Sequence, residues 1–351
     1  MEFRAEVPQA ELDELRRRLD AARWPDQLPG AGSSYGVELG RLRDVAEYWR
    51  TAYDWRRFEK RLNTYPQFVT EIDGQRVHYI RTGTGTPLLL LHGWPGAASD
   101  YLDVIDALAG DLTVVVPTMP GFGFSGVTTA TGWGVDRIAR AWIALMEQFG
   151  FSRYGVHGYD WGARIGPALA RIVPERVIGL HLDGYFVFPQ GDELTDAERQ
   201  RLSGLDRWQN ERSGYAAIQS TRPQTLAYSL LDSPIGQLAW NLEWYDDYGH
   251  REGAIGNDQI LDTVTLTWLT RTAGSQARLY REAQSSWGAE VSFCPVRTGL
   301  AVFPSDSTVR RLVEREFDVV HYTEFDRGGH FAALEVPELV AGDLRAFFAK
   351  L

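Results

Sequence analysis

Short apolar runs alternate with longer helical stretches through most of this 351-residue chain. Each run is short enough to be one strand, and the spacing leaves room for a helix between neighbours. Such alternation predicts an α/β protein with a mostly parallel sheet and helices on both of its faces. The runs expected to form strands are 77–80, 88–91, 112–116, 154–157, 177–182, 296–303 and 319–325.

Residues 188–287 interrupt the alternation with a helical pattern rich in tryptophan and tyrosine. The simplest arrangement is a helical cap inserted into one α/β core. We therefore expect a helical extension at 1–75, the first part of the core at 76–187, the cap at 188–287 and the second part of the core at 288–351. Apolar periodicity predicts helix over 8–62 with a break at 25–36 and one continuous second stretch at 39–62. An amphipathic helix is expected around 339–348.

An aspartate occupies the middle of the turn that follows the fourth run, in Gly158-Tyr159-Asp160-Trp161-Gly162. Small residues at both ends of such a motif are typical of a sharp strand-to-helix turn that presents a nucleophile. A serine there needs a base before it can attack, whereas a carboxylate is ionised at pH 7 and attacks an electrophilic carbon unaided. A simpler interpretation is also open, in which Asp160 caps the following helix.

The loop 92–96, His-Gly-Trp-Pro-Gly, leaves the C-terminal end of the second run. Ligands bind at that edge of open α/β sheets. The backbone N–H groups of Trp94 and Trp161 could converge on one oxygen and form an oxyanion hole. His92 is expected to support this loop. The alternative is a plain tight turn.

His330 follows the last run, and the neighbouring glycines leave its imidazole room to point into a cleft. The chain order of nucleophile, acid and histidine marks it as a candidate base. Two carboxylates could orient it, because Asp306 follows the sixth run and Asp183 ends the fifth. Position along the chain leaves both open. The histidines interpreted as packing or surface residues are His78, His157, His181, His250 and His321.

Bulk properties exclude several classes of function. The formal net charge of −11 disfavours nucleic acid and anionic membranes as partners. One cysteine, Cys294, allows no internal disulfide and no thiolate cluster for zinc. The stretch 121–126 fits G-x-G-x-x-G, but Pro120 precedes it and no helix follows directly, so we expect no dinucleotide. The sequence shows no metal-binding motif, and we expect no metal and no other cofactor. The charged N-terminus shows no signal peptide or anchor, which favours a cytoplasmic setting. A homodimer is one assembly that we keep open.

These motifs resemble an epoxide hydrolase of the α/β-hydrolase superfamily, of the microsomal and juvenile-hormone type that has an N-terminal extension. The resemblance covers nearly the whole chain. The membrane-anchoring helix of the microsomal members is missing, so the chain is similar to the soluble bacterial ones. The stretches that carry the resemblance are 15–19, 23–26, 53–56, 63–68, 92–96, 160–162 and 327–333.

The resemblance implies particular roles for individual residues. They are the nucleophile Asp160, the base His330, the acid Asp306 and the two tyrosines that hydrogen-bond the epoxide oxygen, Tyr215 and Tyr280. Asp183 stays an alternative acid, because it stands where related chains carry asparagine. By spacing alone, any aromatic residue of the cap could be a packing residue.

The implied reaction turns an epoxide and water into a vicinal diol through a covalent ester on Asp160, without a cofactor. Haloalkane dehalogenase is the nearest rival, since it uses the same kind of nucleophile. A departing halide needs no acid, so the tyrosine pair argues against that rival. A silent member that only binds ligands is the rival from another class, and the complete set of motifs argues against it.

Overall fold

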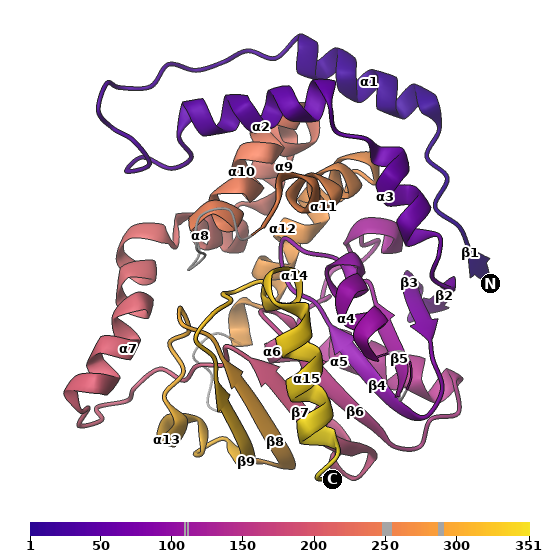
Figure 1. Cartoon of the computed structure of the whole chain (residues 1–351), viewed down its shortest axis with the longest axis vertical. Coiled ribbons are helices and arrows are strands. Elements are labelled where there is room, and N and C mark those ends of the chain that lie inside the picture. The colour runs from indigo at the N-terminus through magenta and orange to yellow at the C-terminus, as the bar shows by residue number, and fades with distance from the viewer. Residues whose placement is uncertain (109, 111, 248–254, 287–290) are drawn as a thin grey trace.

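The computed structural model describes all residues apart from 109, 111, 248–254 and 287–290, so His250 lies outside the described residues. The described residues form a nine-stranded sheet in the order β1-β2-β3-β5-β4-β6-β7-β8-β9 (Figure 1). The strands are β1 Glu2–Phe3, β2 Gln67–Ile72, β3 Gln75–Thr82, β4 Thr86–Leu91, β5 Leu112–Pro117, β6 Tyr154–Gly158, β7 Val177–Asp183, β8 Cys294–Val302 and β9 Phe317–Glu324. Strands β4 to β9 pair in parallel, and β1, β2 and β3 complete one edge in antiparallel pairing.

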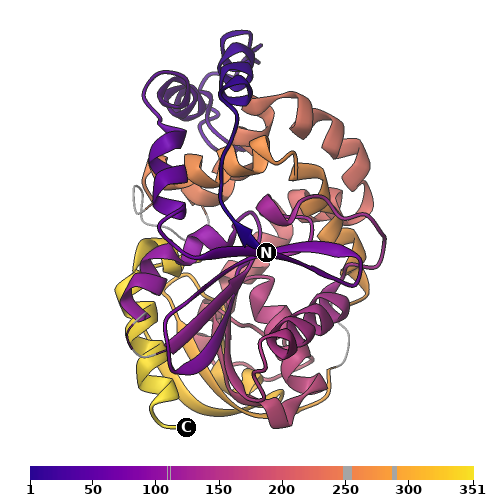
Figure 2. The same ribbon diagram turned by 90° about the vertical axis from the view of Figure 1, so that its right-hand side faces the viewer.

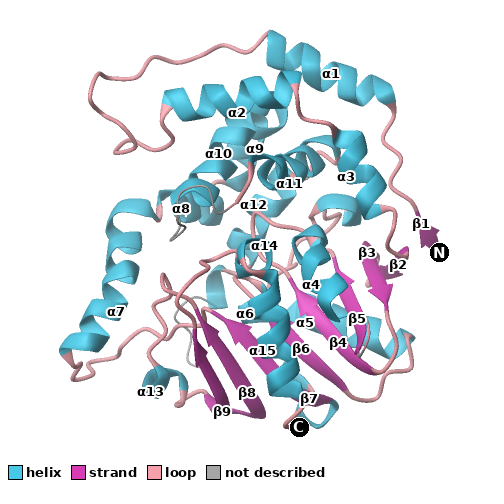
Figure 3. Ribbon diagram, in the orientation of Figure 1, coloured by secondary structure: helices cyan, strands magenta, loops and turns pink. Residues whose placement is uncertain are grey.

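Helices surround this sheet on both faces and extend beyond one end (Figure 3). They are α1 Gln9–Asp20, α2 Leu39–Thr51, α3 Trp55–Leu62, α4 Leu102–Leu108, α5 Val135–Gln148, α6 Gly162–Ile172, α7 Asp196–Arg207, α8 Gly214–Thr221, α9 Pro223–Asp232, α10 Pro234–Asp247, α11 Asn257–Leu269, α12 Ala273–Glu282, α13 Arg310–Val313, α14 Ala332–Glu335 and α15 Pro337–Phe348. The prediction of an α/β fold with a mostly parallel sheet is confirmed.

Continuous apolar runs form the central strands because both of their faces are covered. In β4, the residues from Leu88 to Leu91 are all buried. Helices α4 and α15 contact each other and the sheet on one face, and α5 and α6 pack together on the other. The carboxyl ends of β4, β6, β7 and β8 therefore meet at one edge of the sheet, where the loops gather.

Helices α7 to α12 lie in the chain between β7 and β8, and we call them the helical insertion. Helices α8 to α12 gather with α1, α2 and α3 at one end of the sheet (Figure 1 and Figure 2), whereas α7 extends along the side of the molecule near β9 and α13. Helix α10 contacts α1 and α2, and α11 contacts α3. The hydrogen bonds that join these segments include those from Tyr48 to Asp258 and from Tyr53 to Asp262, each 2.8 Å long. None of the described helices is long and apolar enough to cross a membrane.

The structure departs from the sequence-based prediction at the N-terminal side. The stretch 39–62 is two helices, because Asp54 interrupts it and caps α3 by accepting a hydrogen bond from the Arg56 N–H. Strands β1 and β2 were not predicted, since their residues have no sustained apolar run. Strands β8 and β9 each begin two residues before the apolar runs that predicted them. The limits of the cap and the extension as domains stay predictions.

Candidate active site

Asp160 lies in the sharp turn between β6 and α6. Its backbone φ is +50°, a left-handed conformation that costs energy for a residue other than glycine. The turn can close because Gly158 and Gly162 lack side chains. A Cβ at Gly158 would overlap the backbone of Gly162, and a Cβ at Gly162 would overlap the carbonyl of Leu91. The strained turn that the motif predicts is therefore present.

The alternative interpretation of Asp160 as a helix cap is wrong. Trp161 occupies the cap position of α6, and no side chain makes a capping hydrogen bond there. The Asp160 carboxylate instead accepts a hydrogen bond from the backbone N–H of Trp94, with 2.7 Å between N and Oδ1. The carboxylate thus points away from its own helix and towards the loop that follows β4.

The loop after β4 fits closely against Asp160, which makes it more than a tight turn. A Cβ at Gly93 would lie 2.6 Å from Cγ of Asp160, so a side chain there would displace the carboxylate. His92 is fully buried, and its Nε2 accepts the N–H of Met119 at 3.0 Å. Its Nδ1 therefore carries the proton and donates to the carbonyl of Gly93 at 2.9 Å. His92 supports the loop as predicted.

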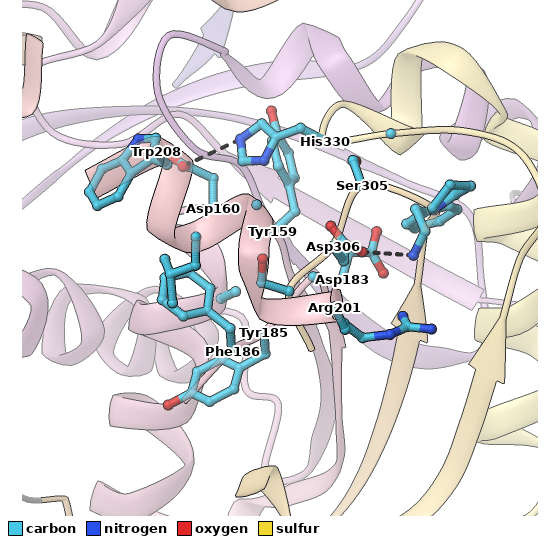
Figure 4. Close-up of a pocket in the computed structure, with 18 of the residues that line it drawn as sticks. Tyr159, Asp160, Asp183, Tyr185, Phe186, Arg201, Trp208, Ser305, Asp306 and His330 are labelled. Atoms are coloured by element: carbon cyan, nitrogen blue, oxygen red, sulfur yellow. Dashed lines mark hydrogen bonds and ion pairs between the residues drawn. The ribbon is translucent and has the colours of Figure 1, made fainter. Parts of the chain in front are cut away.

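His330 faces the other oxygen of Asp160. Its Nε2 lies 3.5 Å from Oδ2, and about a fifth of each side chain is exposed, so both reach the cavity (Figure 4). Gly328 has a φ of +91°, and a Cβ there would press on Val336 and Phe303. This glycine lets the chain turn sharply after β9 and bring the imidazole back over the sheet edge.

Both candidate acids lie near His330, but their surroundings differ. Asp306 Oδ2 accepts the backbone N–H of Phe303 at 2.7 Å. Burial raises the pKa of Asp306 to about 6, although that N–H and His330 act in the opposite direction. Burial and the charges of Asp306 and Asp343 raise the pKa of Asp183 well above its usual range. His330 is among the groups that lower the pKa of Asp306, which fits a pairing of these two residues, and the choice between the two acids stays a prediction.

Tyr215 from α8 and Tyr280 from α12 come together above this turn, with ring centroids 5.7 Å apart. The ring of Trp94 stacks on Tyr215 at 5.2 Å and meets the edge of Tyr280 at 5.8 Å. The Trp161 ring meets Tyr280 at 4.9 Å. Burial, Tyr215 and Asp160 raise the pKa of Tyr280 well above its usual range, so its hydroxyl keeps its proton and can donate it in a hydrogen bond.

One cavity of about 640 Å³ collects these groups. The predicted site residues that line it are Asp160, Trp161, Asp183, Tyr215, Tyr280, Asp306 and His330. Trp94 contacts the site through its N–H and through its ring. An imidazole, a carboxylate and two tyrosine hydroxyls thus surround a space large enough for a small organic molecule.

Sequence reasoning missed four arginines that line the same cavity, namely Arg164, Arg201, Arg207 and Arg212. They lie on helical segments without a motif, and no sequence signal separates them from surface arginines. It also missed Asp100, which is buried against Gly96 of the loop 92–96 and accepts a hydrogen bond from the Tyr159 hydroxyl. Burial raises the pKa of Asp100 to about 7.

The strained carboxylate turn, the facing N–H and the histidine after the last strand define a hydrolase of the α/β-hydrolase class. The family model described as "alpha/beta hydrolase fold" matches residues 86–224. A second model, "Epoxide hydrolase N terminus", matches residues 1–101 and covers the extension that precedes the core.

Relatives of known name narrow the class to a family. A protein of Stigmatella aurantiaca, provisionally named an epoxide hydrolase, is 40% identical over an alignment 374 residues long. The alignment covers 99% of this chain and 84% of that protein. Epoxide hydrolase 1 of Sus scrofa is 31% identical, over 99% of this chain and 88% of its own length. The chain therefore belongs to the epoxide hydrolase family, and the haloalkane dehalogenase alternative is not favoured.

Solved structures agree with this placement. The Aspergillus niger epoxide hydrolase superposes with a TM-score of 0.92 at 29% identity, covering 99% of this chain and 96% of that one. The juvenile hormone epoxide hydrolase of Bombyx mori gives a TM-score of 0.88 at 29% identity, over 100% and 94% of the two chains. The predicted fold and family are confirmed.

Proposed function

We propose that this epoxide hydrolase opens its substrate in two steps through a covalent ester on Asp160. The observation that carries the proposal is the position of the Asp160 carboxylate, held by the Trp94 N–H on one side and faced by His330 on the other. A bound nucleophile with a separate base beside it suits a ring opening followed by hydrolysis.

In the first step, Oδ2 of Asp160 attacks one ring carbon and the carbon–oxygen bond of the epoxide breaks. We assign Oδ2 because Oδ1 is already held by the Trp94 N–H. Tyr215 and Tyr280 hold the ring oxygen, and one of them gives it a proton, because an unprotonated alkoxide is a poor leaving group. The product is a hydroxyalkyl ester of Asp160.

In the second step, His330 takes a proton from water, and the resulting hydroxide adds to Cγ of the ester. The N–H groups of Trp94 and Trp161 would hold the negative oxygen that develops. Asp306 orients the imidazole and stabilises its positive charge. Collapse of the intermediate breaks the bond between Cγ and Oδ2, releases a vicinal diol, and regenerates the carboxylate with one oxygen from water. His330 gives its proton to the departing alkoxide, and the proton left on the water-derived oxygen of Asp160 passes to the tyrosinate, so both water protons are accounted for.

A single turnover in ¹⁸O-labelled water tests this scheme. With enzyme in excess over styrene oxide, the first diol must be unlabelled, because its new oxygen comes from Asp160, and label must appear in the enzyme. Asp160→Asn should make no diol at first. Labelled diol in the first turnover would exclude the ester.

Cellular setting and assembly are separate proposals. A cytoplasmic location fits a chain with one cysteine, Cys294, which is buried and free. A homodimer is the assembly that we propose to examine first. Cell fractionation checks the location, and light scattering during gel filtration checks the assembly. Membrane-bound enzyme or a monomer at micromolar concentration would contradict these two proposals.

A further inference from the structure

A row of buried side chains runs through the sheet from the active site to the surface. His157 on β6 and His181 on β7 are register partners, and their Nδ1 atoms lie 3.0 Å apart. Nε2 of His181 lies 2.9 Å from Oδ2 of Asp343 on α15. Asp183, which lines the cavity, ends the row at distances of 3.7 Å from His157 Nε2 and 3.6 Å from His181 Nδ1. None of these residues has a part in the proposed two-step reaction.

Lys350 and His321, at the outer end of the row, determine which nitrogen of His321 carries its proton. Lys350 can only donate, so Nδ1 of His321, 2.9 Å from its Nζ, must be an acceptor. The proton of His321 is therefore on Nε2, which donates to Oδ1 of Asp343 at 2.8 Å. Asp343 also accepts from Thr323 and faces Nε2 of His181. Burial alone would raise the pKa of Asp343, but the hydrogen bonds from His181, Thr323 and His321 hold it below its usual range.

The carboxylate of Asp343 determines which ring nitrogens of His181 and His157 carry protons. His181 faces the Asp343 carboxylate with Nε2, which makes Nε2 the donor. With one proton on each of the two imidazoles, Nδ1 of His157 then donates to Nδ1 of His181. Burial lowers the pKa of His157 well below its usual range, so in this arrangement its Nε2 is a bare acceptor. That Nε2 and Oδ1 of Asp183 are both buried without a hydrogen-bond partner among the described residues. When His157 and His181 carry one proton each, the group at the position of Asp183 must therefore be a hydrogen-bond donor.

Three carboxylates lie close together here, and they differ in the donors that they receive. Asp343 accepts hydrogen bonds from His181, His321 and Thr323, and Asp306 accepts one from the backbone N–H of Phe303. Among the residues that the structure describes, no such donor reaches Asp183, and 6% of its surface is exposed. When like charges share a buried site, the least stabilised group takes up the proton.

We propose that Asp183 is a neutral carboxylic acid that donates its proton to Nε2 of His157, and that it is a positioning residue which leaves Asp306 as the charged partner of His330. The role of Asp306 rests on the proposed function. The carboxyl must approach His157 by about 0.5 Å to reach hydrogen-bond distance. Moving its proton to His181 would bury two further charges in the sheet, which the neutral form avoids.

A metal ion is the competing occupant of this place. Ligand atoms of His157, His181 and Asp183 lie within 4.8 Å of one another, and all three residues are buried. However, the two Nδ1 atoms are already at hydrogen-bond distance from each other. Elemental analysis of the purified enzyme decides between the two. One metal ion per chain, lost in His157→Gln, would overturn the proposal.

Infrared spectroscopy tests the protonation without using turnover. Wild type at pH 7 should show the carbonyl stretch of a buried carboxylic acid, sensitive to exchange in D2O and absent in Asp183→Asn. Asp100 should contribute a second such band, so Asp100→Asn separates the two. The surface variant Asp318→Asn should leave both bands. Loss of no band in Asp183→Asn would show an ionised Asp183 and refute the proposal.

Kinetics tests the positioning role. Asparagine is neutral and can donate to His157, so Asp183→Asn should keep kcat within about threefold, whereas Asp306→Asn should slow ester hydrolysis by about 10³- to 10⁴-fold. Asp183→Leu, which cannot donate, should lower kcat and shift its pH profile, while ester formation stays near the wild-type rate. If Asp183→Asn accumulates ester as Asp306→Asn does, Asp183 is the charged acid and the proposal fails. If Asp160→Asn keeps its activity, the proposed function fails instead, while the infrared result stands.

Discussion

The two oxygens of Asp160 face different partners, since Oδ1 accepts the Trp94 N–H at 2.7 Å and Oδ2 lies 3.5 Å from Nε2 of His330. One oxygen is held while the other is open to the cavity. The arrangement separates ring opening, which needs the carboxylate and a proton donor, from ester hydrolysis, which needs the base. Variants can therefore block one step and leave the other.

Replacing the base should trap the ester. In His330→Gln the carboxylate and both tyrosines remain, so substrate should still alkylate Asp160, while hydrolysis slows by about 10³-fold or more. Intact-protein mass spectrometry should show a stable increase by one substrate mass. Asp160→Asn is the control that should gain no mass. Full turnover by His330→Gln would contradict the role of His330.

Removing a tyrosine hydroxyl should slow the step that forms the ester. Tyr215→Phe and Tyr280→Phe should each lower its rate by about 10- to 100-fold, because the ring oxygen loses a donor. Trp161 packs on Tyr280, so stopped-flow tryptophan fluorescence should follow this step. Tyr228→Phe, at an exposed position on α9, is the matched control. An unchanged rate of ester formation in both single variants would mean that Tyr215 and Tyr280 are packing residues and donate no hydrogen bond to the ring oxygen.

Activity and stability should respond to pH in opposite directions near the active site. The pKa of Asp306 is about 6 in the folded protein, against about 3.9 in an unfolded chain. Between these values the folded state binds more protons, so the free energy of unfolding falls as pH rises from about 4 to 6. The same ionisation supplies the charge behind His330, so kcat should rise over this range.

The comparison of wild type with Asp306→Asn isolates this effect. Asp262 also has a pKa raised to about 6, and its contribution to stability should be the same in both proteins. Melting temperatures measured from pH 4 to 7 should therefore converge at low pH and favour the variant at high pH, while kcat favours wild type. A variant that loses stability at pH 7 would show that Asp306 is not a destabilising charge.

The close fit of the oxyanion loop should make Gly93 intolerant of a side chain. In Gly93→Ala the new methyl would meet Cγ of Asp160 at 2.6 Å, so we expect kcat/KM to fall by about 10²-fold or more as the carboxylate moves. Gly342→Ala is the matched control, because its Cβ has open space within helix α15 and alanine favours a helix. It should keep activity and gain up to about 1 kcal/mol of stability. Wild-type kcat/KM in Gly93→Ala would refute the close contact.

The sequence predicts the central sheet and the turn around Asp160 well, because both depend on local signals. Apolar runs covered on both faces form strands, and Gly158 and Gly162 mark where the backbones approach. The antiparallel edge is less visible, because β1 and β2 carry no sustained apolar run. The division between α2 and α3 depends on one capping side chain, that of Asp54, within a pattern that is otherwise continuous.

The buried polar groups could not be predicted, because their partners are far apart in the sequence. His181 and Asp343 are 162 residues apart, and Tyr159 and Asp100 are 59 apart. Single histidines in apolar strands give the same signal whether they pack or form a chain of hydrogen bonds. The choice between Asp183 and Asp306 likewise depends on which donors the folded chain brings to each, and this is a property of the tertiary structure.

The N-terminal helices contribute no residue to the proposed reaction, but they contact the helical insertion that carries Tyr215 and Tyr280. Tyr48 on α2 and Tyr53, between α2 and α3, donate hydrogen bonds to Asp258 and Asp262 on α11. Helix α10 contacts α1 and α2. The nucleophile belongs to the sheet, whereas the tyrosine hydroxyls belong to the helical insertion. We therefore expect this third segment of the chain to influence the distance between the tyrosine hydroxyls and Asp160, so that substitutions in the N-terminal helices would change the rate of ring opening without altering any residue of the cavity.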